Sequence, residues 1–491
     1  MSVADSVADS AADSAADSAA DSFADALASR FARLQAAARH DPNPAPAIRE
    51  KRLHTLERLL RDEEAALIDA VGRDFGHRSP AESRLFELFP SHQALRHARR
   101  HLRRWMRPQR RPVGLWFQPA RAEVRYSPLG AVGVMVPWNY PLYLAIAPLA
   151  SALAAGNRAL VKMSEFTPAT ATLFAELLAR HFADDELSVV EGDAAVAQEF
   201  ARLPFDHLLF TGSTAVGRSV MRSAAENLTP VTLELGGKSP AIIGPGLSDR
   251  HFVHAVERIV VGKCLNAGQT CIAPDYVLLP AGTEEAFVEQ ARRVFAVCYP
   301  DVVHSTDYSS VIDPRQYARL TALLDEARSA GTRVFELTPG VAADPLRRRF
   351  PPVILLDPAD DLRVMREEIF GPLLPVRTYS SLDEALAYVN RRPRPLALYY
   401  FDQRSANIER VLDGSVSGGV TVNDVILHIA QDELPFGGVG PSGMGRYHGF
   451  AGFKTFSVER AVFRQSRLSG IGLFKPPYGA LFDRLTRLML R

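Results

Sequence analysis

The chain contains little cysteine and carries no excess of charge of either sign. Its 491 residues include 3 cysteines, Cys264, Cys271 and Cys298. This number is small and odd, so it does not fit a disulfide framework. We therefore expect a reducing compartment and a cytoplasmic location. The 57 basic side chains nearly balance the 56 acidic ones, so no overall electric field favours nucleic acid or a strongly acidic partner.

Long apolar runs and a recognisable secretion signal are also missing. The most hydrophobic stretch, residues 142–156, is shorter than the ~20 residues that span a bilayer, and Pro148 interrupts it. We interpret this stretch as a buried core helix. The last residues, LFDRLTRLMLR, place apolar side chains on one helical face, which is typical of a helix on a membrane surface or against protein. We favour docking on the chain itself or on a partner subunit, and we expect no membrane association.

Residues 3–22 lack a large apolar side chain. They form near-identical tetrads, VADS-VADS-AADS-AADS-AADS. A segment that buries no apolar surface cannot offset the entropy lost when it becomes ordered. The pattern predicts a disordered low-complexity tail over residues 1–22, with a weak helix as the alternative.

The rest of the chain has the composition of an ordinary globular protein. Hydrophobic residues make up 47% and charged residues 23%, and the length predicts about two to four domains. Residues 23–75 show helical spacing of leucines. The arginine-rich segment RHARRHLRRWMRPQRR, residues 96–111, is interpreted as a solvated helix face, because a nucleic-acid surface would need a wider basic area.

From residue 124 to about residue 425, short apolar runs alternate with helical patterns. This alternation predicts parallel strands joined by helices that cover both faces of a sheet. The pattern begins again after residue 235. We therefore predict an α/β fold with two doubly wound, parallel-sheet domains that meet near LELGGKSP.

A turn of small residues follows the apolar run HLLF. Gly212 and Gly217 lie in TGSTAVGRS, which leads into a helical pattern, and the unpaired N–H groups at a helix start attract anions. A nucleoside-triphosphatase loop would need lysine at Arg218, and the G-x-G-x-x-G fingerprint is absent from the first strand–helix turn. The turn predicts an anion site, with a tight packing turn as the alternative. Lys162 and Glu165, at the end of another apolar run, could bind an adenosine ribose.

Cys271 is the candidate nucleophile. It follows Ala267, Gly268 and Thr270, whose small side chains permit close approach of a ligand, and a proline and an apolar strand come directly after it. Glu234 lies in a glycine-containing turn at the end of an apolar run, where its carboxylate could act as a general base toward a thiol or a water. An inert packing cysteine is the alternative, and the spacing alone leaves both interpretations open.

Seven motifs occur in order along the chain: PWNYP (137–141), LVKMSE (160–165), FTGSTAVG (210–217), LELGGKSP (233–240), NAGQTCIAP (266–274), EEIFGP (367–372) and PFGGVGPSGMGRYHG (435–449). Together they resemble the aldehyde dehydrogenase family over about residues 30–475. The last motif, the HIA segment before it and the PPYG tail resemble the class 3 and coniferyl-aldehyde branch in particular. Cys264 stands where that family usually carries an aromatic residue, which affects local packing.

The resemblance implies a covalent mechanism. Cys271 would be the nucleophile, and Glu234 would activate the water that releases the acid. Asn139 and the backbone N–H of Cys271 would form the oxyanion hole. An enzyme that transfers the acyl group to coenzyme A uses the same sulfur without the base, so Glu234 favours water as the acceptor. The remaining alternative is a catalytically silent nucleotide-binding protein of the same fold.

The resemblance also implies NAD as cofactor, with NADP possible. Lys162 and Glu165 would hold the adenosine ribose, and Glu165 would repel a 2′-phosphate. Glu368 and Phe370 would position the nicotinamide ribose and ring. The other implied cofactor contacts are Pro137, Trp138, Gly212, Ser213, Val216, Gly217, Leu235 and Gly236. No metal ligand is predicted.

The expected substrate is an aromatic aldehyde, such as a coniferyl-type compound, or a medium- or long-chain aliphatic one. The residues expected to line its channel are Tyr140, Tyr143, Thr270, Ile272 and His428; His428 is alternatively a structural histidine. The implied domains are an NAD(P)-binding domain (23–235), a catalytic domain (236–428) and a return segment with an oligomerisation region and C-terminal helix (429–491). We expect a homodimer, in which strand 121–127 and the segment after residue 450 pair between subunits.

Overall fold

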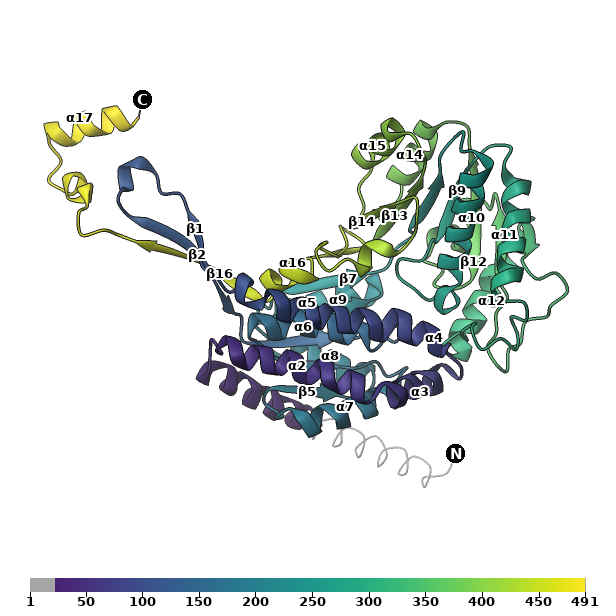
Figure 1. Cartoon of the computed structure of the whole chain (residues 1–491), viewed down its shortest axis with the longest axis horizontal. Coiled ribbons are helices and arrows are strands. Elements are labelled where there is room, and N and C mark those ends of the chain that lie inside the picture. The colour runs from purple at the N-terminus through teal and green to yellow at the C-terminus, as the bar shows by residue number, and fades with distance from the viewer. Residues whose placement is uncertain (1–22, 491) are drawn as a thin grey trace, which may run out of the picture.

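The computed structural model describes residues 23–490, so the predicted tail at residues 1–22 lies outside the described residues. Two helix-covered sheets form two lobes, and a narrow three-stranded sheet projects from them as an arm (Figure 1). The predicted α/β fold with two doubly wound sheets is confirmed. None of the helices described between residues 23 and 490 combines the length and hydrophobicity needed to span a bilayer.

The first sheet has six strands in the order β15-β7-β6-β3-β4-β5. All its pairs are parallel except β15 with β7. Its strands, in chain order, are β3 (Ala131–Met135), β4 (Arg158–Lys162), β5 (Leu187–Val190), β6 (His207–Gly212), β7 (Val231–Leu235) and β15 (Gly443–Met444).

The second sheet has seven strands in the order β10-β11-β12-β9-β8-β13-β14. Only β10 with β11 is antiparallel among its pairs. Its strands, in chain order, are β8 (Pro240–Ile243), β9 (Tyr276–Pro280), β10 (Arg333–Glu336), β11 (Val353–Leu356), β12 (Leu373–Tyr379), β13 (Ala397–Phe401) and β14 (Gly419–Val422).

Helices flank both sheets. Beside the first sheet lie a helix over residues 23–40, α2 (Pro46–Asp62), α3 (Glu64–Phe75), α4 (Pro80–Ser83), the π-helical turn η1 (Arg84–Leu88), α5 (Phe89–Trp105), α6 (Tyr143–Ala155), α7 (Pro168–His181), α8 (Ala194–Arg202), α9 (Thr214–Ala225) and α16 (Gly449–Thr455). Beside the second sheet lie α10 (Asp249–Cys264), η3 (Leu265–Gly268), α11 (Glu284–Cys298), α12 (Pro314–Ser329), α13 (Arg363–Arg366), α14 (Leu382–Asn390), α15 (Ser405–Gly414) and η4 (Leu427–Ala430).

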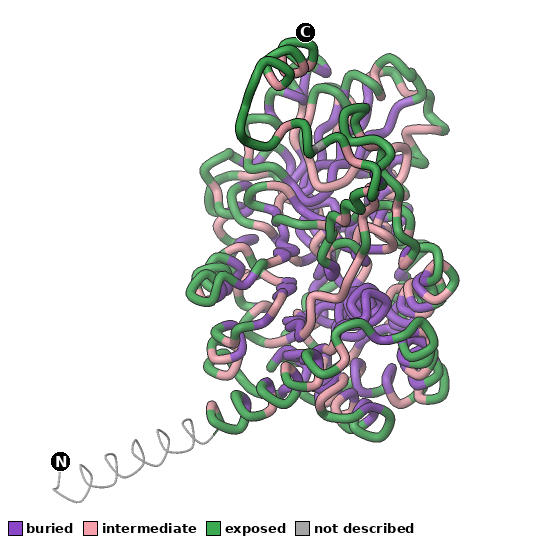
Figure 2. Tube along the Cα trace, turned by 90° about the vertical axis from the view of Figure 1, so that its left-hand side faces the viewer, coloured by how far each residue is buried: buried purple, intermediate pink, exposed green. Residues whose placement is uncertain are grey.

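Alternate side chains along a strand enter different cores, as a doubly covered sheet requires. In β3, Val132 and Val134 belong to the core shared with α5 and α6. Ala131 and Met135 of the same strand face the core shared with α8 and α9. Figure 2 shows the buried residues gathered inside the lobes. The continuous apolar runs in the sequence therefore reflect strands that are buried on both faces.

The hydrophobic stretch 142–156 forms α6, all of whose residues are buried despite Pro148, so the predicted core helix is confirmed. The arginine-rich segment forms most of α5, which buries Leu95, Leu102 and Trp105 and leaves most of its arginines toward solvent. Both helices pack together beneath the first sheet. The N-terminus of α6 thereby has a fixed position next to the PWNYP turn.

The arm consists of β1 (Gln109–Arg111), β2 (Arg121–Pro128) and β16 (Ser457–Arg464), in that order and antiparallel. Short turns η2 (Leu115–Phe117) and η5 (Gly470–Phe474) and helix α17 (Ala480–Met489) lie toward its end (Figure 1). The expected pairing between subunits of strand 121–127 with the segment after residue 450 is wrong. These strands pair within one chain, where β16 covers one edge of β2 along its whole length and β1 covers Ala122–Val124 on the other edge.

The chain passes from the first sheet to the second directly after β7 and returns as β15. We propose domains divided at residues 235/236 and 428/429, because the parallel strands of each sheet fall on one side of the first division. Gly443 of β15 pairs with Glu234 of β7. The return segment is therefore hydrogen-bonded to the strand that carries the candidate base.

Candidate active site

The expected cofactor and catalytic residues of the first sheet gather at the carboxyl ends of its parallel strands. Asn139 follows β3, and Lys162 is the last residue of β4. Ser213 follows β6, and Glu234 is the next-to-last residue of β7. Carboxyl ends of adjacent parallel strands meet at one edge, where open α/β sheets bind ligands. The topology thus brings together residues that lie about a hundred positions apart in the sequence.

Cys271 lies on a loop that follows α10 and has an unusual backbone. Asn266 (φ 50°), Ala267 (φ 51°) and Gly268 (φ 78°) are consecutive left-handed residues. A Cβ at Gly268 would lie 2.4 Å from the carbonyl oxygen of Gly371, so only glycine permits this approach. The loop is therefore pressed against the EEIFGP segment, and the half-buried Cys271 is held beside Glu368.

Asn139 is fixed to the same loop. Its Nδ2 donates to the carbonyl oxygen of Gln269 at 3.1 Å, and its own carbonyl oxygen accepts from Asn266 Nδ2 at 3.0 Å. Arg78 Nη1 also donates to that carbonyl. Asn139 is buried, so these bonds hold its side chain in one place. Because an amide nitrogen carries two N–H groups, one remains to meet a ligand oxygen.

Glu234 is buried, and neither of its carboxylate oxygens has a hydrogen-bond partner among the described residues. Burial raises the pKa of Glu234 well above its usual value, and the charge of Arg446 acts in the opposite direction. A buried carboxyl with a raised pKa and no hydrogen-bond partner is suited to accept a proton from a ligand or a water. A buried carboxyl without a hydrogen-bond partner is more typical of a proton-transferring group than of a structural ion pair.

Glu368 is the second acid of the site. Burial and, after it, the charge of Asp275 raise the pKa of Glu368 to about 8. Its Oε1 is buried without a hydrogen-bond partner among residues 23–490. The Glu368 carboxyl lies against Gly236, where a Cβ would be 2.0 Å from Oε2, so any side chain at position 236 would displace this carboxyl.

The pKa of the Cys271 thiol depends on both carboxyl groups, Glu368 and Glu234. Burial, then Glu368, then Glu234 raise the pKa of Cys271 to about 12, while the backbone N–H groups of Cys271 and Ile272 lower it. These N–H groups therefore point toward the sulfur. Donors aimed at a reacting sulfur are also placed for the oxygen that develops negative charge on the adjacent carbon.

Of the two residues expected to bind the adenosine ribose, Lys162 is buried and Glu165 is exposed. Lys162 Nζ donates to the carbonyl oxygens of Met163 and Gly192, both at 2.7 Å. Glu165 lies at the surface of the β4–α7 turn, and its charge opposes the effect of burial on the pKa of Lys162. Lys162 therefore positions the turn, and Glu165 is the group open to a ligand.

The turn before α9 begins the helix with a side-chain cap. Ser213 caps the helix, and its hydroxyl accepts from the N–H of Val216 at 3.4 Å. Val216 is exposed. A Cβ at Gly217 would lie 2.6 Å from Leu235, so Gly217 lets α9 pack on β7. Gly212 and Ser213 lie at the helix start, whereas Gly217 and Leu235 face each other inside the lobe.

A pocket of about 380 Å³ opens beside this turn, between the two sheets. It is lined by Thr214, Gly236, Gly237, Lys238, Arg366, Glu368, Arg392, Pro393, Arg394 and Pro441. Outside this lining, the rings of Trp138 and Phe370 meet edge to face with their centroids 5.2 Å apart. Pro137 and Trp138 are half-buried. The pocket combines a buried carboxyl with arginines, which suits a ligand that carries both hydroxyls and phosphates.

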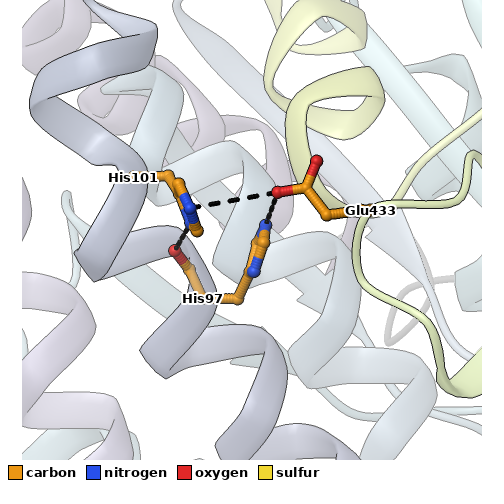
Figure 3. Close-up of side chains that lie close together, drawn as sticks. All are labelled: His97, His101 and Glu433. Atoms are coloured by element: carbon orange, nitrogen blue, oxygen red, sulfur yellow. Dashed lines mark hydrogen bonds and ion pairs between the residues drawn. The ribbon is translucent and has the colours of Figure 1, made fainter.

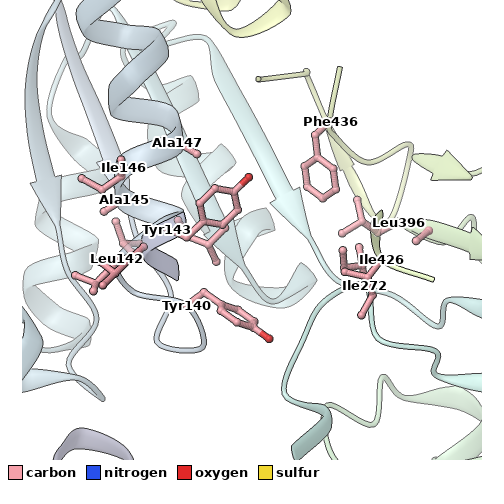
Figure 4. Packing of buried hydrophobic residues seen from close by; sticks show 14 of the residues in the cluster. Tyr140, Leu142, Tyr143, Ala145, Ile146, Ala147, Ile272, Leu396, Ile426 and Phe436 are labelled. Atoms are coloured by element: carbon pink, nitrogen blue, oxygen red, sulfur yellow. The ribbon is translucent and has the colours of Figure 1, made fainter. Parts of the chain in front are cut away.

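The expected substrate residues form two walls. Figure 4 shows Tyr140 and Tyr143 on one side and Ile272, with Phe436, on the other. The Tyr140 hydroxyl bonds Thr270 Oγ1 at 2.7 Å. The Tyr140 hydroxyl is thus engaged, and the Arg78 guanidinium lies 4.5 Å from the centroid of its ring.

His428 takes the structural position that was its alternative interpretation. Its Nδ1 bonds Thr421 Oγ1 at 2.9 Å, and its ring stacks on Phe436 with centroids 5.9 Å apart. Burial lowers the pKa of His428 to about 4, so the ring is neutral. The His428 ring therefore supports the Phe436 ring by packing against it.

Sequence reasoning missed several residues that organise this site. Arg446 is the cation whose charge acts on Glu234, Gln269 and Arg78 fix Asn139, and the Tyr399 hydroxyl donates to the carbonyl of Ile272. Arg446 and Gln269 lie inside quoted motifs, so a residue-by-residue reading of those motifs could have found them. Arg78 and Tyr399 act through contacts between distant segments, for which the sequence carries no local signal.

Comparison with known proteins identifies the family to which this chain belongs. The sequence pattern of the family described as "Aldehyde dehydrogenase family" matches residues 7–462. A Pseudomonas aeruginosa protein named "Probable coniferyl aldehyde dehydrogenase" is 53% identical over 455 residues, covering 93% of this chain and 94% of the relative.

Two solved structures are similar throughout. The substrate-bound state of Staphylococcus aureus AldH is 35% identical, with a TM-score of 0.89, over 94% of this chain and 99% of that chain. A Mycobacterium tuberculosis aldehyde dehydrogenase complexed with NAD+ is 26% identical, with a TM-score of 0.79, over 89% of each chain. The predicted fold, the resemblance and the enzyme class are confirmed. The chain belongs to the aldehyde dehydrogenase family, and it is an NAD(P)-dependent enzyme that oxidises an aldehyde to the carboxylic acid.

Proposed function

We propose that the enzyme oxidises an aromatic, coniferyl-type aldehyde with NAD. The observation that carries this proposal is the aromatic character of the side chains around Cys271, since Tyr140, Tyr143 and Phe436 belong to the apolar cluster on which Cys271 packs. Aromatic pairs favour stacked or edge-to-face contact and add to the apolar area buried. The 53% identity to a relative named for coniferyl aldehyde supports the same substrate class.

Cys271 acts as the nucleophile in this proposal. Its thiolate adds to the carbonyl carbon, a C–S bond forms, and the carbonyl oxygen takes the negative charge. Asn139 Nδ2 and the backbone N–H of Cys271 donate to that oxygen. Loss of one such donor typically costs ~3–4 kcal/mol of barrier, which is why the bonds that immobilise Asn139 matter.

The residues of the pocket beside Glu368 fit a nicotinamide dinucleotide. The unpartnered buried Oε1 of Glu368 suits a ribose hydroxyl, the exposed start of α9 suits a phosphate, and Arg366 and Arg394 line the same pocket. Trp138 and Phe370 would bracket the ring, with Gly236 allowing close approach. A nicotinamide ring held there would supply the hydride acceptor, and Cys271 would then hold the oxidised substrate as a thioester.

Glu234 completes the reaction. Its unpartnered carboxylate takes a proton from water, the resulting hydroxide adds to the thioester carbon, and the C–S bond breaks. The products are the carboxylic acid and the Cys271 thiolate with which the cycle began, and Glu234 passes its proton to solvent. A raised pKa makes Glu234 basic enough to accept this proton.

We also propose NAD rather than NADP, a homodimer and a cytoplasmic location. Exposed Glu165 would repel a 2′-phosphate. For the homodimer, the outer edge of β16 and exposed apolar side chains toward the end of the arm, such as Phe463, Leu481 and Leu488, suit burial against a second copy. Free Cys264, Cys271 and Cys298 fit a reducing compartment.

The substrate proposal predicts a preference that steady-state kinetics can measure. With NAD, kcat/KM for coniferyl aldehyde should exceed that for a medium-chain aliphatic aldehyde, and Cys271→Ser should lower it by at least about a thousandfold. Cys298→Ser, at an exposed thiol, is the matched control and should keep full activity. A preference for the aliphatic aldehyde would overturn the substrate class, and activity in Cys271→Ser would overturn the covalent role.

Glu234→Gln should separate the two halves of the reaction. Hydride transfer precedes hydrolysis, so the variant should give a burst of NADH equal to the active sites. The later steady rate should be about 100-fold or more below that of the wild type. Stopped-flow absorbance checks this. Steady turnover without a burst would remove Glu234 from the hydrolytic step.

Glu165→Gln should make NADP a better cofactor relative to NAD. Removing one like charge near a 2′-phosphate should raise the NADP/NAD ratio of kcat/KM by about five- to tenfold. Glu176→Gln makes the same charge change on the exposed side of α7 and should leave the ratio unchanged. Equal ratios for the two variants would contradict the ribose role.

A further inference from the structure

A cluster of two histidines and a carboxylate lies away from the catalytic residues. His97 and His101 project from one face of α5, four residues apart, toward Glu433 in the segment between η4 and β15 (Figure 3). His97 Nε2 lies 3.2 Å and His101 Nε2 lies 3.9 Å from the same carboxylate oxygen of Glu433. The three candidate ligand atoms all lie within 4.8 Å of one another.

The two rings are already oriented as ligands. His101 Nδ1 contacts the carbonyl oxygen of His97 at 3.0 Å, and a carbonyl only accepts, so Nδ1 carries the hydrogen. In a neutral imidazole the lone pair is then on Nε2, which faces Glu433. A metal-bound histidine is usually fixed in this way by a hydrogen bond from its other nitrogen. Trp105 stacks on His101 with centroids 5.8 Å apart and limits its rotation.

His97 adds a second observation. Its Nε2 is buried and makes no hydrogen bond of suitable geometry among residues 23–490, although it lies 3.2 Å from a carboxylate oxygen of Glu433. A buried polar atom without a well-aligned partner is destabilising, and a metal ion between the two groups would remove this defect.

The distances are compatible with a metal ion shared by the three side chains. Zinc binds histidine nitrogen and carboxylate oxygen at ~2.0–2.2 Å in tetrahedral geometry, which places ligand atoms about 3.4 Å apart. The observed 3.2 and 3.9 Å to Glu433 bracket that separation. Two histidines and one carboxylate leave a fourth position for water, as in open zinc sites.

We propose that His97, His101 and Glu433 bind one divalent ion of the zinc class between α5 and the return segment. The sequence interpretation of residues 96–111 as a solvated arginine face remains valid for the arginines, because the histidines lie toward the body of the protein. The neighbouring Asp432, whose charge interacts with that of Glu433, is the only further carboxylate we associate with the site.

The ion would connect two parts of the enzyme that meet at the active site. Glu433 lies between His428, which supports Phe436, and Gly437, where a Cβ would be 2.9 Å from Glu234 Oε1. α5 packs on α6, the helix that begins at Tyr143. Bound metal would hold the return segment against the first lobe and raise the melting temperature of the whole enzyme.

Cobalt binding to the full, tag-free enzyme tests the proposal. Because Cys271 is itself a metal ligand candidate, the titration is run on the wild type and on Cys271→Ser. We expect one equivalent of Co²⁺ in both, with visible d–d absorption and no thiolate charge-transfer band, and one equivalent of Zn²⁺ that displaces it. Absence of stoichiometric binding, or binding lost in Cys271→Ser, overturns the proposal.

Variants assign the ligands. His101→Gln and Glu433→Gln should each weaken Co²⁺ binding by at least about tenfold and abolish the metal-dependent rise in melting temperature. Glu433 is on the surface, so its variant does not threaten folding. His92→Gln, on the same helix and outside the cluster, is the matched control and should bind normally. Binding that persists in both ligand variants overturns the site.

Discussion

The rest of the structure depends on one constraint, a thiol buried beside two buried carboxyls. Burial raises the pKa of Cys271, Glu234 and Glu368, and the charges of Glu368 and Glu234 raise that of Cys271 further. In a low-dielectric site, like charges repel strongly. The backbone N–H groups at Cys271 and Ile272 and the charge of Arg446 act in the opposite direction. A reaction in which the negative charge moves from the sulfur to the substrate oxygen and then leaves with the hydride suits such a site.

The fold places these groups by joining its two sheets at a single strand. β7 carries Glu234, receives β15 as its antiparallel neighbour, and leads directly into the second sheet. The left-handed turn at Asn266 and Ala267 brings Cys271 and the donor Asn139 into register. Backbone strain of this kind is found where function requires an exact position of a side chain. The packing that stabilises the two lobes therefore also sets the catalytic distances.

The sequence predicted the parts of this arrangement that follow from local patterns. Strands buried on both faces, the helix at residues 142–156 and the residues at strand ends all have a periodic or positional signature. Contacts between distant segments have none. The partner of β2, the packing of Gly217 on Leu235, the capture of Lys162 by backbone carbonyls and the fixation of Asn139 by Arg78 depend on tertiary structure. The histidines at 97 and 101 were hidden among arginines, because their partner Glu433 lies more than three hundred positions away.

The central claim, that the two carboxyls control the charge on the catalytic sulfur, can be tested by the pH dependence of Cys271 alkylation. Iodoacetamide reacts with the thiolate, so the rate reports the pKa of Cys271. A like charge nearby disfavours the thiolate, so removing one should lower that pKa. The account predicts that the alkylation curve shifts to lower pH in Glu368→Gln and, by a smaller amount, in Glu234→Gln, in the order of their effects on the thiol. Curves that coincide with that of the wild type, or that shift to higher pH, would contradict it.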